Sequence, residues 1–142
     1  YAHKPNALKQ ALLALKSHLQ TGKLFCVFGC GGDRDQGKRP LMGAIAEEIA
    51  DHVFITNDNP RTENPEFIAE QILQGCQANN PKIQKILDRR LAIISAIKQA
   101  KPEDIILIAG KGHENYQIIG HEKTHFDDVQ IVRQIMENSQ CN

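Results

Sequence analysis

Short apolar segments alternate with amphipathic segments along this 142-residue chain, and a polar loop directly follows the clearest apolar segments. The segments LFCVF at 24–28 and DIILIAG at 104–110 are almost wholly apolar, as expected for strands that are covered on both faces. The segments 53–56 and 83–87 are weaker candidates of the same kind. Strands that alternate with helices through short connections predict a parallel sheet between two helical layers. The expected fold is therefore α/β, a Rossmann-like three-layer αβα arrangement with a mostly parallel sheet.

Between these segments, apolar side chains recur every three or four residues, as on one face of a helix. Asn6, Asn64 and Asp127 stand where N-capping side chains are expected, and Pro40 opens a further helix. The C-terminal part differs, because two short segments flank a Gly-His pair and so predict an antiparallel hairpin at the edge of the sheet. The predicted helices cover 6–19, 40–50, 65–75, 89–100 and a segment after Asp127, and the hairpin strands cover 116–119 and 122–125.

The length is that of one domain with a core of its own, so residues 1–142 are expected to form a single domain. The 17 Lys and Arg residues balance 17 Asp and Glu residues. A chain without net charge offers no general field for nucleic acid or an anionic membrane, so any anion recognition must be local. The apolar runs are much shorter than a membrane-spanning helix requires. The chain begins at Tyr1, without Met or an apolar signal segment, which indicates a processed or excised chain.

The four cysteines are scattered, without a CxxC pair or the spacing of metal ligands. They are Cys26, Cys30, Cys76 and Cys141. We expect reduced thiols of a cytosolic protein and no metal site. A disulfide framework stays open as an alternative, although a chain of this length does not need one.

In a parallel sheet ligands bind where the carboxyl ends of the strands meet, so the loops after the strands are the candidate sites. The first, at 29–39, contains the GxxxxGK spacing of a phosphate-binding P-loop, but Arg39 follows Lys38 where Ser or Thr would hold magnesium. The dinucleotide fingerprint also fails, because Arg34 takes the place of its third glycine. The first loop is therefore expected to display the side chains of Arg34, Lys38 and Arg39 above the end of a strand. The alternative is a solvated loop whose charges pair with one another.

The second loop contains Asn57-Asp58-Asn59-Pro60-Arg61. Pro60 fixes its own backbone and favours an extended residue before it, so the loop is expected to aim Arg61 at a fixed point. An arginine held in this way can bind a carboxylate through two parallel hydrogen bonds, while Asp58 and Asn59 can accept from an ammonium group. An Asx-turn that leads into the Asn64 cap is the alternative interpretation.

The third loop is Gly110-Lys111-Gly112-His113-Glu114. Its glycines allow a ligand to approach the backbone closely, and Glu114 can complement a second ammonium group. His113 could carry a proton or could simply hydrogen-bond its surroundings. The three loops together favour a zwitterionic small molecule over nucleic acid, because single-stranded nucleic acid would require stacking aromatic residues and only 5% of the chain is aromatic.

Five motifs, in the same order along the chain, resemble the C-terminal domain of the Mur ligases, and among these the diaminopimelate-adding type. They are YAHKPNAL at 1–8, FGCGGDRDQGKRPLMG at 28–43, DNPR at 58–61, DRR followed by AI at 88–93, and AGKGHENYQ at 109–117. The DNPR form is the one associated with diaminopimelate rather than lysine. Asn57 and Lys4 depart from the usual family pattern.

The resemblance implies an ATP-dependent ligase of peptidoglycan synthesis in the bacterial cytoplasm. In this family ATP phosphorylates the D-glutamate γ-carboxyl of UDP-MurNAc-L-Ala-D-Glu, and the amine of meso-diaminopimelate then attacks the acyl phosphate. The first domain holds the UDP-sugar peptide, the second carries ATP and Mg²⁺, and the third receives the amino acid. A chain that resembles only the third domain is expected to fold, to bind neither ATP nor Mg²⁺ by itself, and not to ligate.

The resemblance also assigns roles to individual residues, with neither a catalytic residue nor a metal ligand in this part of the ligase. It assigns meso-diaminopimelate contacts to Arg34, Asp58, Asn59, Pro60, Arg61, Gly110 and Glu114, and nucleotide contacts to His3 and Tyr1. Two alternatives remain open. One is a binding module that senses phosphate or an amino acid without chemistry, and the other is a Mur ligase that adds a different amino acid, such as L-lysine.

Overall fold

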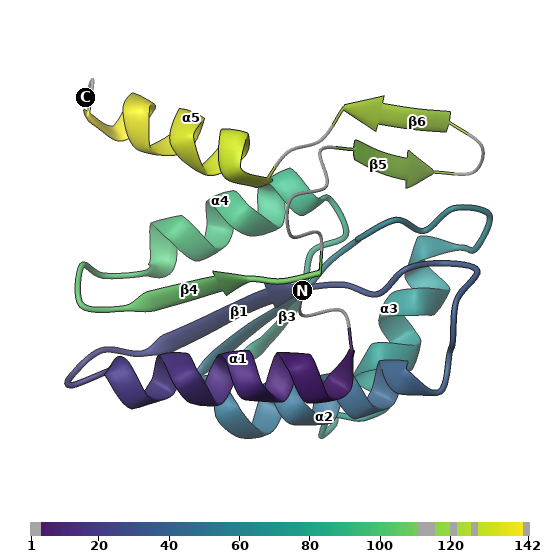
Figure 1. Ribbon diagram of the computed structural model, residues 1–142, viewed down its shortest axis with the longest axis horizontal. Helices are drawn as coiled ribbons and strands as arrows, with labels where there is room; N and C mark the ends of the chain where they lie inside the picture. The colour runs from purple at the N-terminus through teal and green to yellow at the C-terminus, as the bar shows by residue number, and fades with distance from the viewer. Residues whose placement is uncertain (1–3, 111–115, 120–121, 126–127, 141–142) are drawn as a thin grey trace.

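The fold is seen in a computed structural model of the chain, which describes residues 4–110, 116–119, 122–125 and 128–140 (Figure 1). Helices and strands alternate along most of the chain, as the sequence predicts. The helices are α1 (Pro5–His18), α2 (Lys38–Ile49), α3 (Pro65–Leu73), α4 (Arg89–Gln99) and α5 (Asp128–Gln140). The strands are β1 (Leu24–Phe28), β2 (His52–Ile55), β3 (Ile83–Lys85), β4 (Ile105–Ile108), β5 (Tyr116–Ile119) and β6 (Glu122–His125).

The main sheet has four parallel strands in the order β3-β2-β1-β4, which confirms the predicted α/β class. Strand β1 lies inside this sheet and pairs with β2 on one side and β4 on the other, so that Cys26 is opposite Val53 and Leu107. All five residues of β1 are buried. Because the strands are parallel, their carboxyl ends share one edge of the sheet, which we call the carboxyl edge.

Helices cover both faces of the sheet, and α1 and α2 lie on the face opposite α4 and α5 (Figure 1). Successive β1 side chains enter the two cores in turn, since side chains alternate along a strand. Leu24, Cys26 and Phe28 belong to the core under α1, α2 and α3. Phe25 and Val27 belong to the core under α4 and α5. This two-sided burial explains why β1 has no polar residue.

The predicted hairpin is present, and β5 pairs antiparallel with β6 from Tyr116 opposite His125 to Ile119 opposite Glu122. It forms a two-stranded sheet of its own, which corrects the expectation that it extends the edge of the parallel sheet. The reason is geometric. The hairpin lies beyond the carboxyl end of β4, and α5 then returns over α4 (Figure 1), so β5 does not run alongside β4.

The structure corrects two predicted helix starts, and both corrections involve a proline. The predicted Asn6 cap is wrong, because α1 begins at Pro5 with Lys4 at the cap position. Proline suits the first helical position, since its fixed φ is helical and it has no N–H to satisfy there. Helix α2 begins at Lys38, two residues before Pro40, because the first turn of a helix tolerates proline.

Two other helices have side-chain caps. The Asn64 cap of α3 is confirmed, since its Oδ1 accepts a hydrogen bond from the Glu66 N–H at 2.9 Å. Asp88 caps α4 in the same way and accepts from the Leu91 N–H at 3.0 Å. The predicted Asp127 cap lies outside the described residues. None of the described helices combines the length and apolar character needed to cross a bilayer.

The described cysteines Cys26, Cys30 and Cys76 are free thiols, and Cys141 lies outside the described residues. Burial raises the pKa of Cys26 and of Cys30 to about 12. Burial, together with the nearby Glu47 carboxylate, raises the pKa of Cys76 to about 11. These three side chains are therefore protonated at neutral pH and serve as small apolar groups.

Candidate functional site

The loops that follow β1, β2 and β4 meet at the carboxyl edge. We refer to residues 29–37, 56–64 and 109–110, the described part of the third, as the first, second and third loops. At Gly32 a Cβ atom would lie 1.8 Å from the Pro60 carbonyl oxygen, so only glycine allows this approach of the first loop to the second. At Gly110, where φ is +108°, a Cβ would lie 3.5 Å from the Gly29 carbonyl oxygen and 3.9 Å from the Asp58 Oδ2 atom. The described residues of the three loops therefore lie side by side.

The Arg61 side chain reaches from the second loop to the first. Its φ is +52°, in the left-handed region, and the preceding Pro60 carbonyl accepts from the Glu63 N–H at 3.0 Å. The Arg61 Nη1 atom donates to the carbonyls of Gly32 at 3.1 Å and Asn59 at 3.3 Å. Its Nε and Nη2 atoms donate to no described residue, and the side chain is half-buried. One edge of the guanidinium is thus fixed by the protein, and the other can bind an anion.

Arg39 is not displayed at the surface as predicted. The side chain is fully buried, because helix α2 begins at Lys38 and turns the next residue toward α3. Its guanidinium pairs with Glu63, with Nη1 at 2.9 Å from Oε2 and Nη2 at 2.8 Å from Oε1. It also donates to the Gly31 carbonyl at 2.9 Å and to Gln71 Oε1 at 2.6 Å. Arg39 therefore joins the first loop to the second.

Asp33 provides a second connection between these loops. Its N–H donates to Glu63 Oε1 at 2.6 Å, and its carboxylate accepts from the Thr62 hydroxyl at 2.7 Å. Hydrogen bonds from Arg39, and a further one from the Asp33 N–H, hold the pKa of Glu63 below its ordinary value. Arg39 and Asp33 thus bond across to Glu63 and Thr62 of the second loop. Sequence reasoning missed Thr62 and Glu63, whose only signal was their place just after DNPR.

The structure brings together six of the nine residues that the sequence assigned to ligand binding. Arg34, Asp58, Asn59, Pro60, Arg61 and Gly110 all lie at the carboxyl edge. Asp58, Asn59 and Pro60 are buried. A Cβ at Gly31 would lie 3.1 Å from Arg61 Nη1 and 3.5 Å from Arg34 Cγ, so these two arginines flank the same glycine.

Glu114, His113, His3 and Tyr1 lie outside the described residues. The part of the site that is described holds two guanidinium groups and one carboxylate. This combination of charges suits a small molecule that carries carboxylate and ammonium groups.

A magnesium centre and a P-loop do not fit the described residues. Nowhere in 4–110, 116–119, 122–125 or 128–140 do three or more His, Cys, Asp or Glu side chains form a group that could hold a metal ion. The P-loop spacing also ends in Arg39, whose side chain is committed to Glu63.

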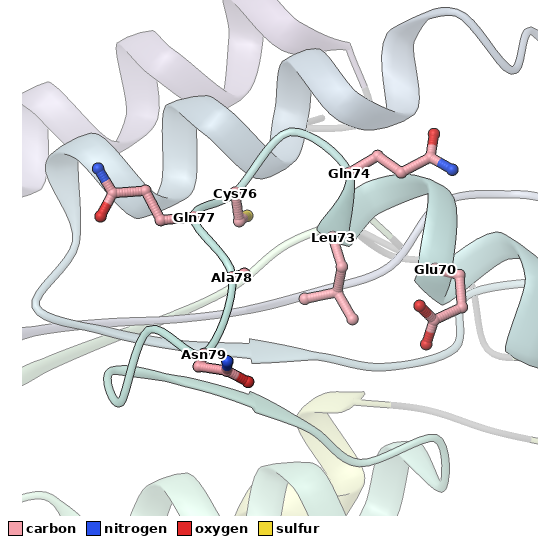
Figure 2. Close-up of a pocket in the computed structure, with 7 residues that line it drawn as sticks. All are labelled: Glu70, Leu73, Gln74, Cys76, Gln77, Ala78 and Asn79. Atoms are coloured by element: carbon pink, nitrogen blue, oxygen red, sulfur yellow. The ribbon is translucent and has the colours of Figure 1, made fainter.

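A surface pocket of about 470 Å³ lies elsewhere, between the end of α3 and the connection to β3 (Figure 2). It is lined by Glu70, Leu73, Gln74, Cys76, Gln77, Ala78 and Asn79. Since this connection enters β3 at its amino end, the pocket is on the edge of the sheet opposite the three loops. It contains none of the residues that the sequence singled out for binding.

Comparisons with known proteins agree with one another. The sequence signature described as "Mur ligase, glutamate ligase domain" matches residues 1–112. The chain is 58% identical over 136 residues to the UDP-N-acetylmuramoyl-L-alanyl-D-glutamate--2,6-diaminopimelate ligase of Prochlorococcus marinus, covering 96% of this chain and 27% of that protein. It is 62% identical over 131 residues to the ligase of the same name from Haemophilus ducreyi, covering 92% of this chain and 26% of that protein.

A solved structure of a UDP-N-acetylmuramoyl-L-alanyl-D-glutamate--2,6-diaminopimelate ligase has the same fold. It matches with a TM-score of 0.92 and 49% sequence identity, over 99% of this chain and 28% of that one. The chain thus spans a little over a quarter of the length of these relatives.

Proposed function

The chain belongs to the Mur ligase family, whose glutamate ligase domain it contains, and from this premise we propose that it is the amino-acid-binding C-terminal domain of an ATP-dependent ligase. The proposed reaction adds meso-diaminopimelate to UDP-MurNAc-L-Ala-D-Glu during peptidoglycan synthesis in the bacterial cytoplasm. The names of the relatives support this substrate. Residues 1–142 would be the third domain, and the UDP-sugar peptide, ATP and Mg²⁺ would be held by the others.

The observation that carries the proposal is the arrangement of Arg61. Its Nη1 atom is occupied by the carbonyls of Gly32 and Asn59, while Nε and Nη2 donate to no described residue. These two nitrogens form the side of a guanidinium that binds a carboxylate through two parallel hydrogen bonds. Meso-diaminopimelate has a distal carboxylate that can occupy this position, and L-lysine has none.

The preference for meso-diaminopimelate over L-lysine depends on the cost of leaving Arg61 without a carboxylate partner. Leaving a charge without its partner costs about 2–5 kcal/mol in a buried interface, and the half-exposed position of Arg61 places it near the lower value. About 2 kcal/mol corresponds to roughly a thirtyfold preference. We assign the second carboxylate of the ligand to the Arg34 guanidinium, and an ammonium group to the Asp58 carboxylate.

The domain's part in the reaction is to bind and orient the amino acid. ATP, bound elsewhere in the ligase, would supply the phosphoryl group that converts the D-glutamate γ-carboxyl of the UDP-sugar peptide to an acyl phosphate. The neutral amine of the amino acid forms the new C–N bond, phosphate leaves with the electrons of the C–O bond, and the amine loses one proton. The residues of this chain hold the amino acid so that its amine can approach that carbon.

Two measurements test the proposal. The full-length ligase that contains this sequence should convert UDP-MurNAc-L-Ala-D-Glu and meso-diaminopimelate to the tripeptide product, as detected by mass spectrometry. Absence of this product with an active ATP site would contradict the proposal. Calorimetric titration of the 142-residue chain with ATP tests the alternative of a nucleotide-binding module, which requires binding in the micromolar range.

A further inference from the structure

Arg89 is the second residue of the DRR motif, which the proposed function leaves unexplained. It is the first residue of α4 and is only 1% exposed. Its Nε and Nη2 atoms pair with the two carboxylate oxygens of Asp128 at 2.8 Å and 2.7 Å. Its Nη1 atom donates to the Asn57 carbonyl at 2.8 Å, and Nη2 also donates to the Ala109 carbonyl at 3.0 Å.

The two carbonyl acceptors belong to different loops of the site. Asn57 directly precedes Asp58 in the second loop, and Ala109 directly precedes Gly110 in the third. Both loops are therefore bonded to one rigid guanidinium. Because the geometry of a guanidinium is planar and fixed, its hydrogen bonds define the distance between the two carbonyls. The Arg39 and Glu63 pair joins the first two loops, and Arg89 joins the second and third.

The position of Arg89 is not explained by the stability of its helix. A cation in the first turn of a helix is unfavourable with respect to the helix dipole. The Asp128 carboxylate compensates for this charge from the first turn of α5, and Asp88 caps the helix through its own carboxylate. An uncharged residue would have avoided the need for this compensation, so the contacts with the two loops are the feature that requires arginine.

A purely structural role would be to dock α5 on α4. Arg90 already links these helices at the surface, because its Nη1 atom donates to Gln134 Oε1 at 3.3 Å. Arg90 has no bond to the loops in the described part of the chain. The neighbouring arginines thus separate two roles, since both connect α4 with α5 and only Arg89 reaches the carboxyl edge.

We infer that Arg89 is a positioning residue, which fixes the main chain of the second and third loops and thereby the shape of the amino-acid site. The inference takes its ligand, meso-diaminopimelate, from the proposed function. Lysine at this position keeps a cation for Asp128, but a single ammonium group cannot reproduce the fork to both carbonyls. The substitution Arg89→Lys therefore separates loop positioning from charge pairing, and Arg90→Lys is the matched control.

In the full-length ligase, Arg89→Lys is expected to raise the KM for meso-diaminopimelate by about tenfold, as for the loss of one well-placed contact. The KM for ATP should stay within about twofold, because the two carbonyls that Arg89 holds belong to the loops that we assign to the amino acid. Arg90→Lys should change neither value. An unchanged KM for the amino acid in Arg89→Lys, or an equal rise in both KM values, would overturn the inference.

A readout that does not depend on the ligand separates this inference from the proposed function. Hydrogen exchange of the 142-residue chain should show faster exchange of the amides at 57 and 109 in Arg89→Lys than in Arg90→Lys. If the wild-type ligase adds no diaminopimelate, the proposed function fails, and the exchange result still decides the role of Arg89. Equal exchange in the two variants contradicts that role.

If Arg89→Lys does not fold, a second variant tests the role of Arg89. Asp128→Asn keeps Arg89 and both of its carbonyl bonds but removes the opposing charge. It should lower the Tm while the KM for the amino acid stays within about twofold. A raised KM in this variant would mean that docking of α5, rather than Arg89, sets the loops.

Discussion

Arg39 and Glu63 form a two-point ion pair across the first two loops of the carboxyl edge, with nitrogen to oxygen distances of 2.9 Å and 2.8 Å. The arginine side chain is fully buried, and the Glu63 side chain is 16% exposed. Burying a guanidinium costs free energy unless its charge is paired and its donors are bonded. Four hydrogen bonds from Nη1 and Nη2 satisfy these two nitrogens, whereas Nε has no partner in the described part of the chain.

Glu63→Gln is therefore expected to lower the free energy of unfolding by about 2 kcal/mol, below the range for fully buried pairs because Glu63 retains some exposure. Urea denaturation of the chain measures this value. Glu70→Gln is the matched control, since Glu70 pairs with Lys85 at 3.0 Å but is 55% exposed. The control should lose less than about 1 kcal/mol. Equal losses in the two variants would contradict the assigned importance of burial.

The same carboxylate makes stability depend on pH. Its pKa in the folded chain is held below the ordinary value of 4.5, first by the Arg39 hydrogen bond. A lowered folded pKa contributes stability that is fully present above the unfolded pKa and is lost as pH falls through the folded pKa. We expect the wild-type chain to lose stability from about pH 5 downward, and Glu63→Gln to lose less over the same range.

Asp104 adds to this acid sensitivity at the other edge of the sheet, because the Lys101 and Lys23 N–H groups lower its pKa. Asp104→Asn should therefore remove a separate part of the pH dependence. Unfolding at several pH values, with both single variants and the double variant, distinguishes the two contributions. If the free energy of unfolding changes with pH equally in wild type and in Glu63→Gln, Glu63 does not contribute to the pH dependence.

The sequence predicted the strands well because their signal is local. The segment LFCVF has no polar residue, and it is buried along its whole length as β1. The three loops were also predictable, since parallel strands bring their carboxyl ends to the same edge. Local reasoning failed at helix ends. Helix α1 begins at Pro5 and not after an Asn6 cap, because two neighbouring residues can both mark the start of a helix.

The buried arginines were not predictable from local patterns. Arg39 lies 24 positions from Glu63, and Arg89 lies 39 positions from Asp128. Each arginine stands among other charged residues, as expected for a solvated loop or helix end. Only the packing of helices on the two faces of the sheet removes these side chains from water and selects their partners. Charge pairs between distant segments therefore required the structure.

The contact between Gly32 and Pro60 gives a third prediction. A methyl group at position 32 would lie 1.8 Å from the Pro60 carbonyl, which belongs to the backbone and cannot rotate away. Gly32→Ala should separate the first two loops and lower the free energy of unfolding by about 1–3 kcal/mol, the usual range for overpacking. It should also break the hydrogen bond from the Gly32 N–H to the Asn59 carbonyl, now 2.7 Å long.

Gly37→Ala in the same loop is the control, because a Cβ there would meet only the end of the Asp35 side chain, at 3.3 Å. Thermal unfolding measures both variants. We expect wild type and Gly37→Ala to have the same Tm, and Gly32→Ala to have a lower one. A Tm of Gly32→Ala equal to that of the control would show that the two loops can move apart without loss of stability.

Replacing Arg61 tests the specificity of the site. Arg61→Ala removes the nitrogens that we assign to the distal carboxylate, so affinity for meso-diaminopimelate should fall by about thirtyfold, corresponding to about 2 kcal/mol. Affinity for L-lysine should change much less, because lysine has no group for Arg61 to bind. Calorimetric titration of the chain with both amino acids measures the preference, and Arg90→Ala, in α4, is the control because its side chain bonds to Gln134 of α5.

Arg61→Lys separates charge from geometry in this experiment. A lysine keeps the cation but cannot form the two parallel hydrogen bonds, so its affinity for meso-diaminopimelate should lie between those of wild type and Arg61→Ala. Thermal unfolding of each variant is needed, because Arg61 also donates to the carbonyls of Gly32 and Asn59. A folded Arg61→Ala chain that still prefers meso-diaminopimelate as strongly as the wild type would place the specificity in another residue.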